Sequence, residues 1–170
     1  KPCPMTVRLS LDAVTLCCID TRHTAQAWYA IDRCMAHVDF GEVLFFCSET
    51  AAQTAQGRPG VRHVVIPALR SIQDYSRFVL RDLAPHIQST HVLIIQWDGF
   101  ITHPHLWDPE FIAWDYIGAP WVYKNRPSEV GNGGFSLRSK KLLQATHALP
   151  WDEKEPEDAA VCRTMRPTLE

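Results

Sequence analysis

Residues 91–100 read HVLIIQWDGF, and this stretch decides the fold because an unbroken apolar run ends abruptly in polar residues. Valine, leucine and isoleucine without polar alternation predict a strand buried on both faces, as in a parallel sheet. We place the strand over residues 91–96, with Asp98 beyond its carboxyl end and Gly99 allowing a sharp turn. The sequence therefore predicts a carboxylate where a buried strand reaches the surface.

Earlier parts of the chain repeat this pattern and alternate it with helical spacing. Further strands are expected over residues 14–20, 42–47 and 61–66. Apolar side chains recur at intervals of three and four over 24–37 and 71–87, which predicts two amphipathic helices, the first capped by Thr24. The second helix should turn Ile72, Tyr75, Phe78, Val79, Leu83 and Ile87 to the core. Alternating strands and helices predict one α/β domain with a mostly parallel sheet flanked by helices.

The second half of the chain has a different composition. Residues 98–129 are rich in Pro, Trp, Asp and Gly and should form irregular turns, before a strand over 135–137 and helices over 140–147 and 159–169. Tryptophans gather here at positions 97, 107, 114, 121 and 151. Such clustering favours a cleft that stacks on flat ligands or sugar rings, with core packing an equal alternative for Trp97 and Trp121.

Charge and hydropathy exclude several functions. The net charge of −2 gives no electrostatic case for binding nucleic acid or an anionic membrane. No apolar run approaches the roughly 20 residues that a transmembrane helix needs. The six cysteines form no CxxC pair, so we expect reduced thiols, no zinc site and a cytoplasmic location.

Polar residues follow the predicted strands where ligands gather in parallel sheets, outside the carboxyl ends. The sequence DTRH, residues 20–23, follows the first strand, and WDGF follows the fourth. Asp98 could bind a divalent cation or simply cap its turn, and Gln96 would lie on the same side of the strand. His103 and His105 are expected on a surface loop rather than as ligands.

Two later motifs could also carry chemistry. The segment GNGG, residues 131–134, removes side chains where a ligand could approach the backbone, so Gly133 and Gly134 could floor a cleft beside the Asn132 amide. An Asn-Gly hairpin turn is the alternative. After Pro156, the acids Glu157 and Asp158 open a helix, where they could either stabilise its dipole or accept a proton from a sugar hydroxyl.

The motifs QWDGF, FIAWDYIGAPW, VGNGGFSLRSKKLL and PEDAAVC occur in that order. Together they resemble an uncharacterised bacterial and fungal family whose members are similar to nucleotide-sugar glycosyltransferases of the GT-A type. The resemblance covers most of the chain. It implies that Asp98 takes the place of the second acid of the DxD motif, which holds a divalent cation (Mn²⁺ or Mg²⁺) and the donor diphosphate. Gln96 stands where the first acid would be, so one acid would hold the cation instead of two.

The resemblance also implies roles for the remaining motifs. The GNGGF segment and Trp121 would line the acceptor side, and Asp158 or Glu157 would be the base. In the loop after the first strand, Asp20 would accept hydrogen bonds from base or ribose, and Arg22 would pair with phosphate.

These expectations combine into one hypothesis. A single GT-A-like domain would bind a nucleotide sugar through residues 12–100 and an acceptor through 101–170. It would transfer a hexose to a hydroxyl of a glycan or glycolipid, inverting the anomeric centre with Asp158 as base. A non-catalytic sugar-binding module or degenerate transferase is the alternative. A sugar nucleotidyltransferase would need a glycine-rich loop after the first strand, and CIDTRHT has no glycine.

Overall fold

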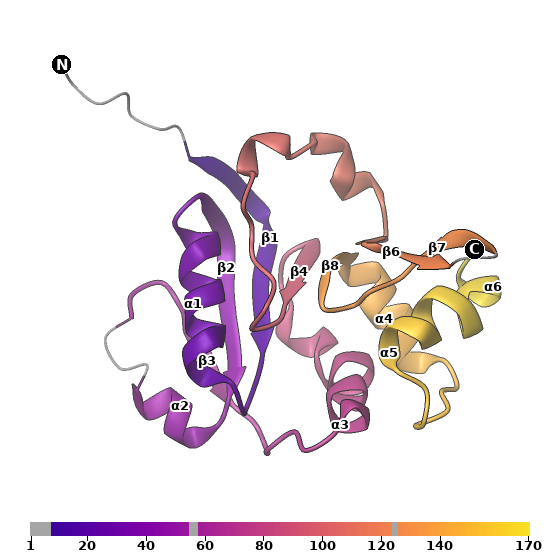
Figure 1. The fold of residues 1–170 in the computed structure, drawn as a ribbon, viewed down its shortest axis with the longest axis horizontal. Helices are drawn as coiled ribbons and strands as arrows, with labels where there is room; N and C mark the ends of the chain where they lie inside the picture. Colours follow the sequence, from indigo (N-terminus) through magenta and orange to yellow (C-terminus); the bar gives the residue numbers. More distant parts are fainter. Residues whose placement is uncertain (1–7, 55–57, 124–125) are drawn as a thin grey trace.

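A six-stranded sheet organises the computed structural model, which describes residues 8–54, 58–123 and 126–170 (Figure 1). Its strand order is β3-β2-β1-β4-β8-β5. The strands are β1 (Leu9–Ile19), β2 (Val38–Cys47), β3 (Arg62–Val65), β4 (His91–Ile95), β5 (Tyr116–Gly118) and β8 (Phe135–Ser139). The first four are parallel, and β8 runs antiparallel to both β4 and β5. The predicted mixed α/β domain with a mostly parallel sheet is confirmed.

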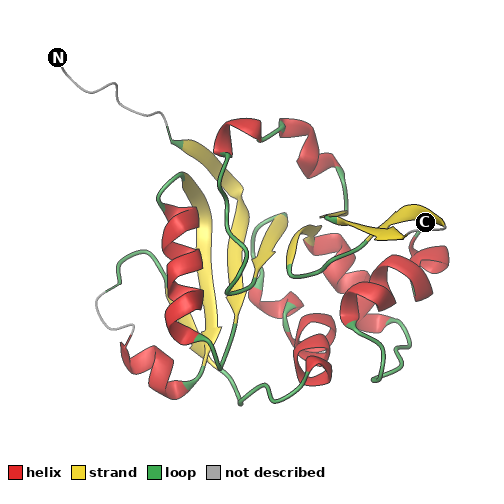
Figure 2. Ribbon diagram, viewed as in Figure 1, coloured by secondary structure: helices red, strands yellow, loops and turns green. Residues whose placement is uncertain are grey.

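Two apolar layers cover the sheet, because successive side chains of a strand point to opposite faces. Leu16 and Cys18 pack with α1 (Thr24–Met35), whereas Cys17 and Ile19 pack with the segment around Phe78 (Figure 2). Every residue of β4 is buried, as the unbroken apolar run predicted. The helix α2 (Glu49–Thr54) joins β2 to β3.

The predicted helix over 71–87 is wrong as one continuous helix. It consists of α3 (Ile72–Arg77), a π-helical turn η1 (Phe78–Asp82) and a 3-10 turn η2 (Ala84–His86). Pro85 lies in η2, where it has no N–H to continue an α-helix. Ile72 is exposed rather than on the core face.

Two predicted helix features at other positions also need correction. Thr24 is the first residue of α1, and His23 takes the N-cap position without a capping side chain. The predicted helix over 159–169 is divided into α5 (Glu157–Ala159), a π-helical turn η5 (Ala160–Thr164) and α6 (Arg166–Leu169). Between β8 and these turns, α4 (Lys140–Ala148) forms nearly as predicted and is capped by Ser139.

Residues 98–130 contain more order than the sequence suggested. Two 3-10 turns, η3 (Pro104–Leu106) and η4 (Pro109–Ala113), precede β5. A separate two-stranded sheet follows, made of β6 (Pro120–Tyr123) and β7 (Arg126–Val130). Its apolar residues join a third cluster, in which Trp121 and Val130 pack near Leu142 and Val161.

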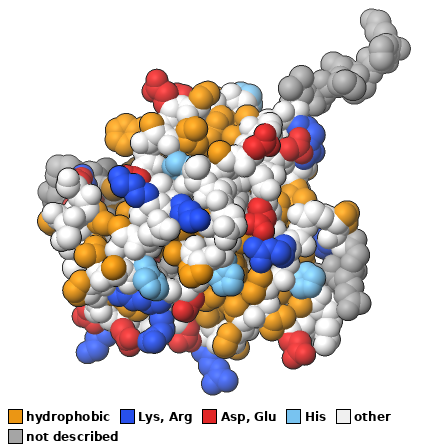
Figure 3. All heavy atoms as spheres, turned by 180° about the vertical axis from the view of Figure 1, so that it is seen from behind, with side chains coloured by type: hydrophobic (Ala, Val, Ile, Leu, Met, Phe, Trp, Pro, Cys, Tyr) orange, Lys and Arg blue, Asp and Glu red, His pale blue; other side chains and the backbone are white. Residues whose placement is uncertain are grey.

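Acidic and basic side chains are interspersed on the face of the molecule opposite the view of Figure 1 (Figure 3). No helix in the described ranges is both long and apolar enough to cross a membrane. Five cysteines are buried free thiols, and burial raises the pKa of Cys34 and Cys162 to about 11. Cys3 lies outside the described residues.

Candidate functional site

A cavity of about 350 Å³ lies beyond the carboxyl ends of β1 and β4. Its wall consists of the loop after β1, residues 69–75 around the start of α3, and Gln96 and Trp97 after β4. We call it the β1–β4 pocket. The strand order reverses between β1 and β4, since β2 and β3 continue on the other side of β1. Ligands of open α/β sheets bind at such a switch point.

Asp20 shapes the loop that borders this pocket. Its carboxylate is buried, and Oδ1 accepts hydrogen bonds from the backbone N–H groups of Arg22 and His23, both at 2.6 Å. The other oxygen lies 3.4 Å from His23 Nδ1. Asp20 is thus engaged with its own loop. Arg22 in this loop is exposed, lines the pocket and forms no ion pair with a described residue.

An aromatic shelf borders the same pocket. The rings of His23 and Trp97 lie 5.0 Å apart between centroids with an interplanar angle of 35°. Trp97 is 40% exposed, so part of its apolar surface is open to a ligand. The shelf joins the loops after β1 and β4, two segments distant in sequence.

Asp98 is exposed on a tight turn in which Gly99 N donates to Gln96 O at 3.1 Å. Across the described ranges, no group of three or more His, Cys, Asp or Glu side chains is placed to hold a metal. The described residues therefore form no centre that would hold Mn²⁺ or Mg²⁺ with protein ligands alone. His103 and His105 pack against each other on the exposed turn η3, as expected of surface residues.

The glycine segment contacts the turn after β4. A Cβ on Gly134 would lie 2.7 Å from Gln96 Oε1, and one on Gly99 would lie 3.3 Å from the Phe135 ring. Asn132 has a φ of 48°, a left-handed conformation that Asn tolerates, and its Oδ1 accepts from Gly134 N at 3.2 Å. The Gln96 side chain therefore lies against the Gly134 backbone, and the Phe135 ring lies against Gly99.

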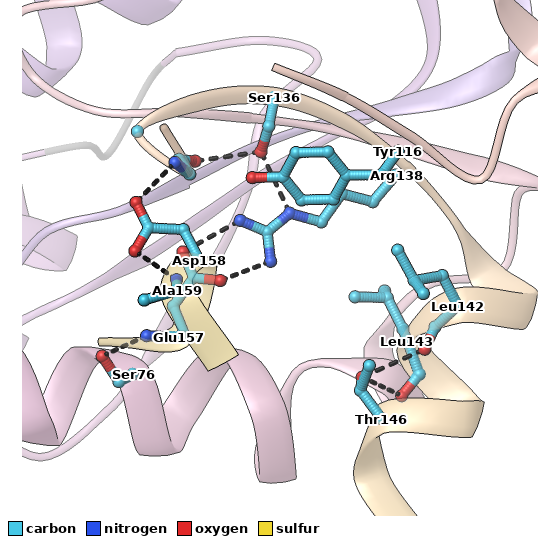
Figure 4. A network of polar contacts seen from close by, with 12 residues as sticks. Ser76, Tyr116, Ser136, Arg138, Leu142, Leu143, Thr146, Glu157, Asp158 and Ala159 are labelled. Carbon is cyan, nitrogen blue, oxygen red and sulfur yellow. Dashed lines mark hydrogen bonds and ion pairs between the residues drawn. The ribbon is translucent and has the colours of Figure 1, made fainter. Parts of the chain in front are cut away.

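Glu157 does not have the free carboxylate that the base assignment required. It is buried and forms a bidentate ion pair with Arg138, with Nη1–Oε2 at 2.5 Å and Nη2–Oε1 at 2.9 Å (Figure 4). Burial lowers the pKa of the Arg138 guanidinium, but the charge and hydrogen bonds of Glu157 together with the neighbouring Tyr116 and Tyr75 outweigh it, so the pKa lies above its ordinary value. Glu157 is a structural partner of Arg138.

Asp158 is half-buried and lies beside the glycine segment. Its Oδ2 accepts from the Gly133 N–H at 3.0 Å, and its Oδ1 accepts from the Ala159 N–H at 2.8 Å (Figure 4). Each carboxylate oxygen has two lone pairs, so both oxygens keep capacity for another donor. Of the two predicted acids, Asp158 is the one whose carboxylate is not held in an ion pair by described residues.

Two predicted acceptor positions are filled by the protein itself. A Cβ on Gly133 would lie 2.0 Å from Glu157 Oε1, so this glycine accommodates the ion pair rather than a ligand. Trp121 packs on Gly131, and the Arg163 guanidinium lies 4.4 Å from the centroid of its ring. The prediction of an open cleft floor is wrong for Gly133, whereas Asn132 is exposed and Gly134 half-buried.

The pocket and the acids nevertheless adjoin one another through Tyr75. This residue lines the β1–β4 pocket, and burial followed by the charge of Glu157 raises its pKa. Its hydroxyl is buried and, within the part of the chain described, has no hydrogen-bond partner in good geometry, with Gln96 as its polar neighbour. Neither Tyr75 nor Arg138 was a predicted site residue. Tyr75 was assigned to the core face of the helix over 71–87, and Arg138 directly follows the strand predicted over 135–137.

Comparisons with known proteins identify a family but no activity. Residues 60–169 match the family described as "Protein of unknown function (DUF5672)". No curated protein matches the chain. Among solved structures, the chain is similar to that of Rv0371c from Mycobacterium tuberculosis H37Rv, with 12% sequence identity and a TM-score of 0.47, over 86% of this chain and 80% of that one.

Proposed function

We propose that this chain, which belongs to the DUF5672 family of proteins of unknown function, is a nucleotide-sugar-dependent glycosyltransferase. One observation carries the proposal. Gln96 lines the β1–β4 pocket at the switch point of the sheet, and its side chain lies against Gly134, the neighbour of the Gly133 whose N–H binds the carboxylate of Asp158. A ligand-sized pocket and a positioned base are the two parts that sugar transfer requires.

The donor would occupy the β1–β4 pocket. The Trp97 and His23 shelf offers a surface on which a nucleobase can stack. Arg22 carries an unpaired guanidinium at the pocket wall and suits a diphosphate, to which it can donate two parallel hydrogen bonds. Gln96 can donate its amide N–H to the sugar or diphosphate. Asp98, exposed on the turn after Trp97, would contact the departing diphosphate with or without a divalent cation.

The chemical step would be a direct displacement. Asp158 accepts the proton of an acceptor hydroxyl while the hydroxyl oxygen attacks the anomeric carbon of the donor. The bond between that carbon and the diphosphate oxygen breaks, and its electron pair leaves with the nucleoside diphosphate. Attack opposite to the leaving group inverts the anomeric centre. A hydroxyl of a glycan or glycolipid is the acceptor class that this chemistry fits.

A non-catalytic sugar-binding or degenerate transferase-like module is the second candidate. Gln96 stands where the resemblance expects the first acid of the DxD motif, and this difference favours the non-catalytic module. Such a module would bind glycans without needing a nucleotide, which separates it from the transferase.

Calorimetry with a panel of nucleoside diphosphate sugars, free nucleotides and free glycans, each with and without Mn²⁺, tests the proposal. The transferase predicts binding of a nucleotide sugar with slow hydrolysis. Asp158→Asn should keep that binding and lose on the order of 10²–10⁴-fold in turnover. Asp82→Asn is the matched control, because Asp82 is an exposed aspartate on η1. Glycan binding with no nucleotide affinity would instead support the module.

A further inference from the structure

We propose that the buried ion pair of Arg138 and Glu157 belongs to a closed ring of contacts that positions the Asp158 carboxylate for proton transfer. Both charged side chains are almost fully buried, at 1% and 4% exposure. The inference rests on the proposed role of Asp158 as base. It assigns Arg138 and Glu157 as positioning residues, neither of which touches a substrate.

The ring can be followed from one residue to the next in Figure 4. Arg138 Nε donates to Ser136 Oγ at 3.0 Å, and Ser136 Oγ donates to Gly133 O at 2.9 Å. On the other side, the guanidinium binds both oxygens of Glu157, which is bonded in sequence to Asp158. Asp158 Oδ2 accepts from Gly133 N at 3.0 Å and closes the ring.

The ring holds Asp158 to another segment of the chain. Asp158 Oδ1 accepts from the N–H of Ala159, the next residue in the chain, and this local contact does not fix Asp158 relative to β8. The Gly133 N–H, which comes from the segment before β8, does fix it. Gly133 can approach so closely only because it has no Cβ, which would lie 3.1 Å from the Asp158 Cβ.

Further contacts fix the ion pair itself. Ser76 Oγ accepts from the Glu157 N–H at 3.1 Å, which ties the start of α5 to α3. The Arg138 guanidinium lies 4.9 Å from the centroid of the Tyr116 ring. The planar guanidinium sets both position and orientation of the carboxylate that it binds in bidentate fashion. By fixing the Glu157 carboxylate, Arg138 therefore also fixes the start of α5, where Asp158 lies.

Stability alone does not explain such a pair. Replacing a buried ion pair by apolar residues of similar volume is often neutral or stabilising, because two charges no longer lose their hydration. A positioning role makes a different prediction for the same replacement. The protein should remain folded while the base loses its place.

The test is the double variant Arg138→Met with Glu157→Met, because either single change leaves a buried charge unpaired. We expect a thermal midpoint at or above that of the wild type and unchanged affinity for the nucleotide sugar found by calorimetry. Turnover should fall on the order of 10²-fold, the scale for a group displaced by about 1 Å. A folded double variant with wild-type turnover would overturn the proposal.

Ser136→Ala opens the ring while both charges of the ion pair stay in place, and it is the variant to use if the double variant does not fold. Once the Gly133 carbonyl is released, the Gly133 N–H should hold Asp158 less firmly, so turnover should fall while affinity for the nucleotide sugar stays unchanged. Thr146→Val is the control, because it removes a buried hydroxyl that binds Leu142 O and Leu143 O outside the ring. Equal turnover in both variants and the wild type would contradict the positioning role.

Hydrogen exchange of the Gly133 N–H, followed by NMR, needs no substrate and separates this inference from the proposed function. If the wild type turns over no nucleotide sugar, the transferase proposal fails, and the exchange rate still reports on the ring. Faster exchange of this N–H in Ser136→Ala than in Thr146→Val supports the ring. Equal rates in the two variants would overturn it.

Discussion

Replacing Gly133 with alanine would place a methyl carbon 2.0 Å from Glu157 Oε1 and 2.6 Å from Arg138 Nη2. Neither atom can move away easily, because the ion pair is buried and its partners are fixed by Ser136 and Ser76. The substitution therefore has to separate two buried charges or shift the backbone between β7 and β8.

The expected cost follows from these contacts. Breaking a buried ion pair costs about 3–5 kcal/mol when one charge is left uncompensated. Among the described glycines, only Gly60 has a positive φ, so alanine at position 133 meets no backbone penalty and recovers about 0.4–1 kcal/mol of unfolded-chain entropy. We expect Gly133→Ala to lower the free energy of unfolding by about 2–4 kcal/mol.

Urea unfolding measures this loss directly. With a denaturant slope of about 2 kcal/mol per molar urea, the middle of the usual range, the midpoint should fall by about 1–2 M. Gly134→Ala is the matched control, because its Cβ would meet the end of the flexible Gln96 side chain, which can turn aside. A change below about 1 kcal/mol is expected there. Equal midpoints for the two variants would refute the rigid ion pair.

Three further changes test other parts of the structure. Trp97→Ala should weaken nucleotide binding about threefold to tenfold by calorimetry through lost stacking, while Trp114→Ala, exposed outside the pocket, should not; equal losses would contradict the shelf. A hydrogen bond from the Arg70 N–H lowers the pKa of Asp74 below 3.8. Its stabilisation is therefore present above that pH and lost as pH falls through the folded value, so urea midpoints of Asp74→Ala and wild type should converge in acid; a constant gap would contradict this. Burial raises the pKa of Cys34 to about 11, so in a Cys3→Ser variant the five buried thiols should resist Ellman's reagent at pH 8 until urea unfolds the chain, and rapid native labelling of that variant would argue against their burial.

The sequence predicted the parallel part of the sheet well because burial on both faces leaves a plain signature. The unbroken apolar runs predicted β4 and the buried ends of β1 and β2 close to their observed positions. The edge strand β3, RHVV, is largely exposed and also lies close to its predicted range. Short strands beside proline leave no comparable periodicity. Both β6, which begins at Pro120, and β7 were therefore missed.

The candidate site was only partly predictable, because motif order is visible in the sequence whereas the tertiary packing that buries a charged side chain is not. Motif order pointed to Asp158 and the glycines, and the structure brings them into contact. Arg138 was missed because Arg in FSLRS has the spacing of a solvent-facing strand residue, whereas tertiary packing of α5 buries it. Glu157 was misassigned because adjacent acids at a helix start are indistinguishable until one of them finds a buried partner.

The role of Asp158 as the base is tested by measuring how fast the wild type and Asp158→Asn release nucleoside diphosphate from a bound nucleotide sugar. We expect release and sugar transfer by the wild type, and release slower on the order of 10²–10⁴-fold by Asp158→Asn at equal donor affinity. Release by Asp158→Asn at the wild-type rate would contradict the assignment of Asp158 as the base.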